Sequence, residues 1–361
     1  MILMLRVTVS MVLSFAVFSA LGQGARHLPD SILHSLFIGV SMPGDAYYRS
    51  GENPKPKESA VGVDSDEVAV RGMLGHIKPC VPSFRGPIPP CILREDAATL
   101  ANVAHWVKCT SGSAVVGDVV IIYFSGHGFQ AGPKTRANWV LYDDLLDIEL
   151  LSELFEHYVA GVRVILVADC CAAGEGTRYQ PVDAMLLNNL AKSDFSDHKS
   201  IDLLKSEYRR FDSMPSSRKQ MTFVEKPSIR RLPTINFIAF LIKKMEEGKG
   251  ISAYLRPEDG SLSPAKNGTV FVYRAAACSR TQSAYCLSTG SFFTNALLAR
   301  WAEGRNQEPL LDLIGNIELK KTPTEQVPEL NRLGPIDSWT TTAPAFKLPC
   351  PQAFDARSIS R

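Results

Sequence analysis

The chain alternates between continuous apolar runs and stretches in which apolar residues recur every three or four positions. Uninterrupted runs of β-branched and aromatic residues are typical of strands buried on both faces of a parallel sheet. Four such runs predict strands at residues 35–42, 119–124, 162–169 and 268–279. Amphipathic stretches predict helices at residues 94–109, 145–161, 234–250 and 291–304. Because strand, helix and strand follow one another, the pattern predicts an α/β fold with a mostly parallel sheet flanked by helices.

Two long polar stretches interrupt this alternation. Residues 43–90 are rich in Pro, Gly and charged side chains and are predicted to be loop. Residues 178–229 are predicted to form a polar surface excursion that is partly helical. The chain has no internal repeat, and we expect a single domain over residues 30–350 with a short last strand around Phe346, followed by a tail at residues 351–361.

The first 22 residues differ from the rest of the chain. Arg6 precedes an apolar run from residue 7 to residue 21, and Ala20 and Gly22 stand two positions apart, as at a small-residue cleavage site. This layout is typical of a secretory signal peptide, so we expect residues 1–22 to direct the protein to the periplasm or outside the cell. The alternative is an N-terminal membrane anchor, although the run is short for a span of about 20 residues.

The composition narrows the classes of function. A formal net charge of +2 gives no basic surplus for a nucleic acid, and no basic-aromatic pattern supplies one. Beyond the first 22 residues nothing predicts a membrane segment. The sequence has no Cys-x-x-Cys or His-Glu-x-x-His pattern for zinc and no Gly-rich phosphate loop. Export would allow the 8 Cys to form disulfides, but spacing alone leaves their pairing open.

Reactive residues follow two of the predicted strands. One strand ends in Ser-Gly-His-Gly, with His127 between glycines, and another ends in Asp-Cys-Cys, with Cys171 as the second cysteine. Catalytic groups gather at the carboxyl ends of parallel strands. The separation of 44 residues from His127 to Cys171 leaves room for one helix and two short loops, so neighbouring strands can bring them together. Such a pair acts as nucleophile and base, with the N–H groups of Gly128 and Cys171 as donors to an oxyanion.

These blocks resemble the caspase-like cysteine peptidases, and most closely the bacterial and fungal metacaspases. The stretch YFSGHG is similar to the histidine block of that family, and ADCCAAG is similar to its Asp-Ser-Cys-His-Ser-Gly block. SLFIGV is more weakly similar to the opening strand of the family, and GSFFTNALLARW is more weakly similar to a downstream helix of the family. The resemblance implies a caspase-like three-layer sandwich and a cysteine-type endopeptidase that acts on protein or peptide substrates, with Cys171 as nucleophile and His127 as its partner.

The same resemblance implies cleavage after Arg or Lys. An acidic pocket would pair with the cationic side chain of the substrate. The resemblance assigns Asp96, Ser125 and Asp169 to this pocket. The alternatives are a helix N-terminal charge for Asp96 and a strand-end cap for Asp169.

Many members of this family need calcium, although the thiol chemistry itself requires no cofactor. Hard carboxylate ligands at close spacing suit Ca²⁺. The acidic group in the corresponding segment consists of Asp143, Asp144, Asp147 and Glu149. A solvated helix start explains the same residues without a metal, so the sequence leaves both interpretations open.

Three departures from the family pattern keep other functions open. Cys170 stands in place of the usual Ser, and Ala172 and Ala173 replace His and Ser. Arg280 lies where the family often has Asp. One alternative is therefore a caspase-like protein that binds or scaffolds partners without catalysis. The other is a legumain-like or gingipain-like secreted cysteine peptidase, which also pairs a His-Gly with a later Cys. The sequence does not define the oligomeric state.

Overall fold

The structure is a computed structural model of the chain. It describes residues 32–48, 59–75, 90–130, 137–147, 151, 154–171, 198–212, 227–229, 231–255, 270–278, 282–303, 310–317, 319 and 326–332. The predicted signal peptide, the predicted strand around Phe346 and the C-terminal tail lie outside the described residues. No helix among the described residues is both long enough and apolar enough to cross a bilayer.

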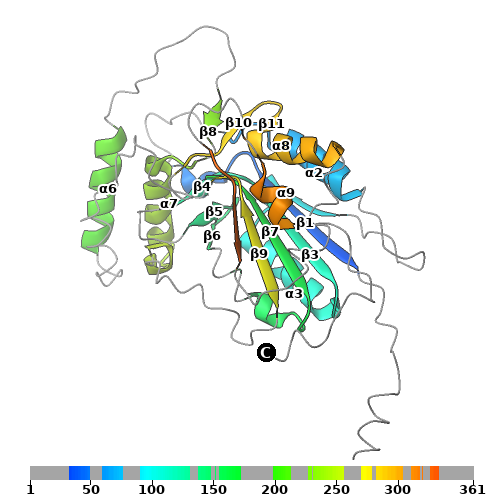
Figure 1. The fold of residues 1–361 in the computed structure, drawn as a ribbon. Coiled ribbons are helices and arrows are strands. Elements are labelled where there is room, and N and C mark those ends of the chain that lie inside the picture. The colour runs from blue at the N-terminus through cyan, green and yellow to red at the C-terminus, as the bar shows by residue number, and fades with distance from the viewer. Residues whose placement is uncertain are drawn as a thin grey trace, which may run out of the picture.

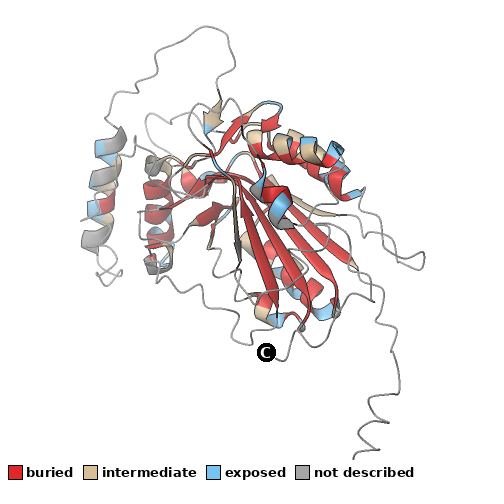
Figure 2. Ribbon diagram, in the orientation of Figure 1, coloured by how far each residue is buried: buried red, intermediate tan, exposed pale blue. Residues whose placement is uncertain are grey.

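A six-stranded sheet forms the centre of the molecule (Figure 1). Its strands, in spatial order, are β12 (Glu329–Arg332), β9 (Phe271–Ala276), β7 (Arg163–Asp169), β3 (Val119–Gly126), β1 (Leu33–Val40) and β2 (Cys91–Arg94). All neighbours pair in parallel except β12, which runs antiparallel to β9 at the edge. The four central strands are buried along their whole length (Figure 2), which explains their uninterrupted apolar sequences.

Helices cover both faces of this sheet. On one face lie α2 (Val63–Gly75), α8 (Phe292–Ala302) and α9 (Leu310–Gly315), and on the other lie α3 (Leu100–Ser113) and the 3₁₀ turn η3 (Phe155–His157). Val70 and Leu297 pack with Tyr123 on the first face. Val103 of α3 packs with Phe124 on the second. The molecule is therefore a three-layer α/β sandwich with a mostly parallel sheet, as predicted.

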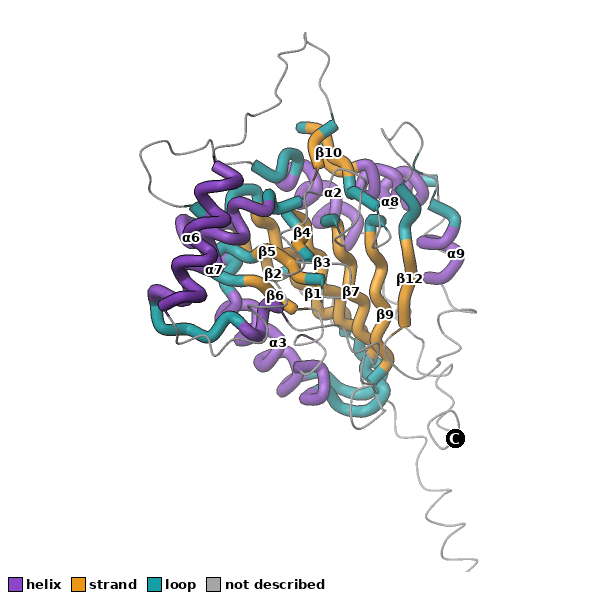
Figure 3. The backbone as a smooth tube through the Cα atoms, turned by 90° about the vertical axis from the view of Figure 1, so that its left-hand side faces the viewer, coloured by secondary structure: helices purple, strands orange, loops and turns teal. Residues whose placement is uncertain are grey.

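A third apolar cluster extends the fold beyond the central sheet. It joins helices α6 (His198–Asp212) and α7 (Thr234–Glu246), which lie side by side (Figure 3), to a small sheet and two 3₁₀ turns. The small sheet consists of β4 (Gly128–Phe129), β5 (Asn138–Val140) and β6 (Leu145–Asp147), and the turns are η1 (Asp45–Tyr47) and η4 (Ser252–Leu255). The ring centroids of Phe129 and Phe237 lie 4.1 Å apart in a stacked pair. Since β4 begins directly after His127, this cluster holds the chain that leaves β3.

A second small sheet lies near the N-terminus of α8. It contains β8 (Ser228–Ile229), β10 (Tyr285–Leu287) and β11 (Gly290–Ser291), all paired antiparallel. Helix α6 and strand β8 fall within the polar excursion predicted at residues 178–229, so that stretch is partly helical as expected.

Three predicted elements are corrected by the structure. Residues 43–90, predicted to be loop, contain helix α2. The buried face of that helix includes Asp66 and Glu67, and these charged residues interrupt the apolar period that would predict a helix. The helix predicted at residues 94–109 begins at Leu100, where Thr99 accepts a hydrogen bond from the Asn102 N–H at 3.1 Å; residues 95–97 form the 3₁₀ turn η2 (Glu95–Ala97). The helix predicted at residues 145–161 begins instead with strand β6, whose pairing with β5 overrides its leucine-rich sequence.

Candidate active site

The two strands that carry the candidate residues are neighbours in the sheet. Strands β3 and β7 pair in parallel, and Ser125 stands opposite Asp169 at the end of the ladder. His127 and Cys171 each follow two residues later. Residues two apart in a strand point to the same face, and residues matched across a parallel pair point to a common face. The pairing therefore brings the chain at His127 and at Cys171 to the same edge of the sheet, where each residue is only 2% exposed.

The thiol of Cys171 is covered by the segment after β9. Its Sγ accepts a hydrogen bond from the Ala284 N–H at 3.3 Å and lies 3.8 Å from the Ala284 carbonyl oxygen. Cys171 packs in the cluster under α2 and α8, whereas Cys170 packs in the cluster under α3. The adjacent cysteines therefore belong to opposite faces of the sheet.

Gly128 lets the two strand ends approach closely. A Cβ atom at this position would lie 1.8 Å from the Cys171 carbonyl oxygen, a distance that no side chain tolerates. The backbone here is fixed on both sides, since the His127 carbonyl accepts from the Val140 N–H at 3.0 Å and the Gly128 carbonyl accepts from the Leu232 N–H at 3.1 Å. The glycine after His127 is thus required by packing.

Asp169 is buried at the N-terminus of α8. Its Oδ2 accepts hydrogen bonds from the hydroxyl groups of Ser291 and Thr294, and the Tyr123 hydroxyl lies 2.6 Å from Thr294 Oγ1. Ser291 is also the N-cap of α8, and its Oγ accepts from the Thr294 N–H at 2.8 Å. The positive end of the helix dipole favours a carboxylate at this place.

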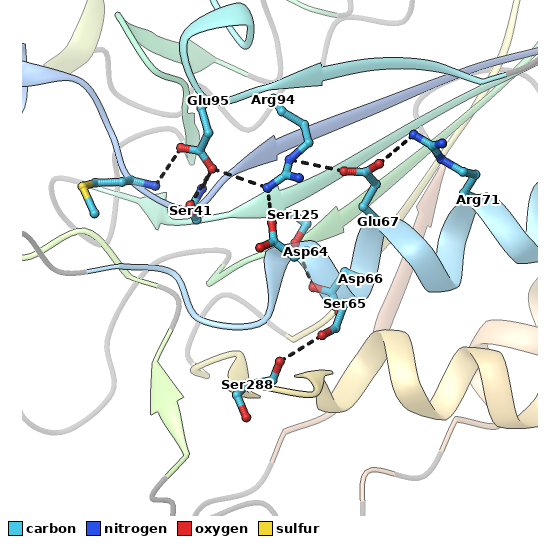
Figure 4. Close-up of polar contacts among 11 residues, drawn as sticks. Ser41, Asp64, Ser65, Asp66, Glu67, Arg71, Arg94, Glu95, Ser125 and Ser288 are labelled. Carbon is cyan, nitrogen blue, oxygen red and sulfur yellow. Dashed lines mark hydrogen bonds and ion pairs between the residues drawn. The ribbon is translucent and has the colours of Figure 1, made fainter.

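A second buried carboxylate, Asp66, lies beside Ser125 (Figure 4). The Ser125 hydroxyl donates to Asp66 Oδ2 at 2.8 Å, and the Ser291 N–H donates to Asp66 Oδ1 at 2.9 Å. Ser291 therefore joins Asp66 and Asp169 through its N–H and its hydroxyl. Asp66 was missed in the sequence because residues 43–90 were predicted as loop. The signal that would have found it is the spacing of Val63, Asp66, Val70 and Met73 along one helical face.

Asp96 occupies a different environment. It is exposed in η2, at the end of the edge strand β2, so the acid beside Ser125 is Asp66 rather than Asp96. Its neighbour Glu95 has a positive φ of 46° and accepts hydrogen bonds from the Ser41 and Met42 N–H groups at 3.1 and 3.2 Å. Arg94 reaches Glu67 of α2 at 3.2 Å (Figure 4). These contacts tie the end of β2 to β1 and to α2.

The acidic loop between β5 and β6 faces a buried ammonium group. Lys244 Nζ, on α7, lies 2.8 Å from Asp144 Oδ2 and donates to the Asp143 carbonyl at 3.1 Å, with the ring of Phe240 5.0 Å away. The Asp143 carboxylate accepts from the Leu100 N–H at 2.9 Å. Burial, followed by the negative charge of Asp144, raises the pKa of Tyr254 far above its usual value, so its phenol remains protonated.

Of the other two acids predicted for a metal site, only one lies within the described residues. Asp147 ends β6 opposite Asn138, and Glu149 lies outside the described residues. Within the part of the chain that the structure describes, no cluster of three or more His, Cys, Asp or Glu side chains is placed to hold a metal ion.

Comparison with known proteins agrees with this architecture. The chain matches the family model described as "Caspase domain" over residues 92–335, more than half its length, and so belongs to the caspase family. This is a family of cysteine peptidases that act on proteins. Strand β1 and helix α2 precede the matched region and complete the same sheet and its cover. A search of curated proteins gave no match.

Several solved structures are similar to the chain, among them the following two. Protein GSU0716 from Geobacter sulfurreducens has a TM-score of 0.60 and 18% identity, covering 88% of this chain and 99% of its own, and shows the same fold. Caspase-1 from Spodoptera frugiperda has a TM-score of 0.42 and 9% identity, covering 88% of this chain and 90% of its own.

The close approach at Gly128 gives a direct test of the packing between the two strand ends. Gly128→Ala forces the Cys171 carbonyl away and should lower the free energy of unfolding by about 1–3 kcal/mol, measured by urea denaturation. Gly112→Ala is the matched control: nothing lies within 4 Å of its Cβ position in α3, so it should stabilise the protein by ~0.5–1 kcal/mol. A Gly128→Ala protein as stable as the parent would contradict the packing described.

Proposed function

We propose that this protein is a cysteine endopeptidase in which Cys171 is the nucleophile and His127 the proton-transfer group. The observation that supports the proposal is the pairing of Ser125 with Asp169, two residues before His127 and Cys171, at the ends of adjacent strands. Membership of the caspase family supports the same chemistry. It does not favour the two alternatives, a non-catalytic scaffold or a legumain-like or gingipain-like peptidase. Assignment to the metacaspases within the family is part of this proposal.

The reaction follows from the chemistry of the pair. The thiolate of Cys171 attacks the carbonyl carbon of the scissile bond, and the imidazolium of His127 gives a proton to the departing amine. The thioester that remains is hydrolysed by a water molecule, which transfers a proton to the imidazole. The N–H groups of Gly128 and Cys171 are the proposed donors to the oxyanion in both steps. The close approach of Gly128 to the Cys171 carbonyl supports placing these two backbone groups in one site.

Buried acids support a preference for Arg or Lys before the cleaved bond. Asp66 and Asp169 are joined through Ser291, and Ser125 donates to Asp66. A substrate guanidinium or ammonium that enters between two buried carboxylates forms charge-assisted hydrogen bonds shielded from water. We therefore place Asp66 in the pocket in the position that the sequence assigned to Asp96. Arg280 lies outside the described residues.

The described part of the acidic loop fits calcium poorly. The Lys244 ammonium already neutralises Asp144, and the Asp143 carboxylate is engaged by the start of α3. We therefore propose that Lys244 supplies the positive charge at this loop and that peptidase activity needs no added calcium. The loop is linked to the site, because β5 donates to the His127 carbonyl through Val140.

Export remains a proposal that rests on residues 1–22. A periplasmic or extracellular location would expose the protein to disulfide formation. N-terminal sequencing of the protein recovered from outside the cytoplasm would locate the cleavage, which we expect after Gly22.

The nucleophile is tested by comparing adjacent cysteines. Cys171→Ala should abolish cleavage of peptides with Arg, Lys or Asp before a reporter group, because no other thiol replaces the attacking atom. Cys170→Ala removes a thiol that packs in the cluster under α3, although its Sγ lies 3.1 Å from the Cβ position of Gly128, and should leave most of the activity. Equal turnover by the parent and the Cys171→Ala protein would rule out the mechanism. Peptides with Asn before the reporter distinguish a legumain-like specificity.

The proposed specificity pocket is tested by substituting two acids, one of which is buried and the other exposed. Asp66→Asn should lower kcat/KM for Arg peptides by about 30-fold or more, since a buried charge pair loses one partner at a cost of ~2 kcal/mol or more. Asp96→Asn, on the surface, should change it by less than about twofold, in line with small surface charge effects. The reverse order of effects would return Asp96 to the pocket and remove Asp66 from it.

The role of Lys244 is tested with its exposed neighbour on the same helix. Lys244→Met leaves the Asp144 carboxylate without its buried counter-ion and should lower the free energy of unfolding by about 3 kcal/mol, whereas Lys243→Met should have little effect. The activity of the parent should not change when calcium is removed with a chelator. Activity that is lost with the chelator and restored by calcium would contradict the proposal.

A further inference from the structure

A short segment of the chain covers the thiol of Cys171 and places a backbone N–H group against it. This covering segment, residues 282–285, follows β9 and ends at the first residue of β10. The Ala284 N–H donates to Cys171 Sγ at 3.3 Å, and both residues are buried. A hydrogen bond to sulfur stabilises the thiolate more than the neutral thiol. The position of the covering segment therefore affects how readily the sulfur ionises.

The side chain of Gln326 holds the covering segment at its far end. Its Oε1 accepts from the Tyr285 N–H at 3.3 Å, and its Nε2 donates to the Ala277 carbonyl at 2.9 Å. Because a carbonyl only accepts and an N–H only donates, these partners define the orientation of the amide group. A further hydrogen bond, from the Val327 N–H to Gln282 Oε1 at 2.8 Å, joins the same two stretches of chain. Gln326 is only 4% exposed, so bulk water does not compete for its hydrogen bonds.

The hydrogen bonds of Gln326 complete a ring that begins and ends near the nucleophile. The Ala277 N–H donates to the Ala168 carbonyl at 2.9 Å, near the end of β7 and three residues before Cys171. Gln326 joins Ala277 to the covering segment, and the covering segment returns to the sulfur of Cys171. The ring thus sets the N–H of the segment relative to the strand that carries the thiol.

We propose that Gln326 is a positioning residue for the nucleophile, because it holds the covering segment where the N–H of Ala284 stabilises the thiolate of Cys171. This inference rests on the proposed function, in which Cys171 supplies the attacking sulfur. Gln326 acts through the backbone of the covering segment, and its amide group carries no charge.

The test follows the alkylation of Cys171 by iodoacetamide as a function of pH, in the full chain with its thiols reduced. Tandem mass spectrometry after digestion assigns the alkyl group to Cys171 rather than to Cys170. Gln326→Met keeps the length of the side chain and removes both hydrogen bonds. The midpoint of the rate profile should move up by about one pH unit, which is an about tenfold loss of thiolate stability for one hydrogen bond to a charged group. A change in access to the sulfur alters the plateau of the rate and leaves the midpoint in place.

The substitution leaves the titratable groups on this side of the sheet unchanged. They lie at the two strand ends, on α2 and around the covering segment: His127, Asp169, Cys170, Asp66, Cys278 and Tyr285. Gln and Met are both uncharged. A shift of the midpoint therefore comes from the altered hydrogen bonding and not from an added or removed charge.

Thr110→Val is the matched control. The Thr110 hydroxyl donates to the Trp106 carbonyl at 2.7 Å in α3, which packs on the other face of the sheet. This variant loses a hydrogen bond away from the thiol and should keep the midpoint of the parent. Gln326→Asn is a second variant, since its side chain is too short to bridge Tyr285 and Ala277, and it should shift the midpoint in the same direction as Gln326→Met. Urea denaturation establishes that each protein is folded under the conditions of alkylation.

The outcomes separate this inference from the proposed function, because alkylation needs no peptidase activity. A midpoint that stays in place in the folded Gln326 variants, or that moves equally in Thr110→Val, overturns the inference. A shifted midpoint in a chain whose parent cleaves no peptide contradicts the proposed function alone. Normal cleavage by the parent together with an unshifted midpoint in the Gln326 variants contradicts the positioning role alone.

Discussion

The parallel pairing of β3 with β7 is the constraint on which the rest of this structure depends. The pairing sets Ser125 opposite Asp169 and brings the segments that follow the two strands, with His127 and Cys171, to one edge of the sheet. A shift of one residue would send the side chains that follow to the other face of the sheet. The register is fixed by burial, because alternate residues of both strands belong to separate clusters under different helices. The same packing that stabilises the core therefore aligns the candidate catalytic residues.

The N-terminus of α8 positions the two buried acids, Asp66 and Asp169. Two carboxylates in one dry site repel each other, and each costs free energy to remove from water. Here, hydrogen bonds from Ser125 and from the N–H and hydroxyl of Ser291 offset that cost, together with the dipole of the helix. The arrangement is suited to a cationic group, which would relieve the remaining repulsion. The proposed preference for Arg or Lys thus depends on the N-terminus of α8 as well as on the two acids.

Much of the central sheet could be predicted from the sequence, because strands buried on both faces have uninterrupted apolar runs and β3, β7 and β9 all show them. The prediction that His127 and Cys171 follow two of these strands rests on the same signal. Helix α2 could not be recognised, since Asp66 and Glu67 occupy its buried face, so the sequence did not indicate Asp66 as the acid that we propose for the pocket. Strand β6 has a helical apolar pattern that only its pairing with β5 corrects. The contact of Lys244 with Asp144 joins residues 100 positions apart and has no local signal.

The most direct test of the account asks whether the thiol at 171 and the imidazole at 127 share one cleft. Dibromoacetone, a short reagent with two electrophilic carbons, can alkylate a thiol and then a nearby imidazole. After its reaction with the native protein and digestion, mass spectrometry identifies the joined peptides. The account predicts one dominant cross-link, between the peptide that contains Cys171 and the peptide that contains His127. Cys171 joined to any other residue, or modified without a cross-link, would contradict it.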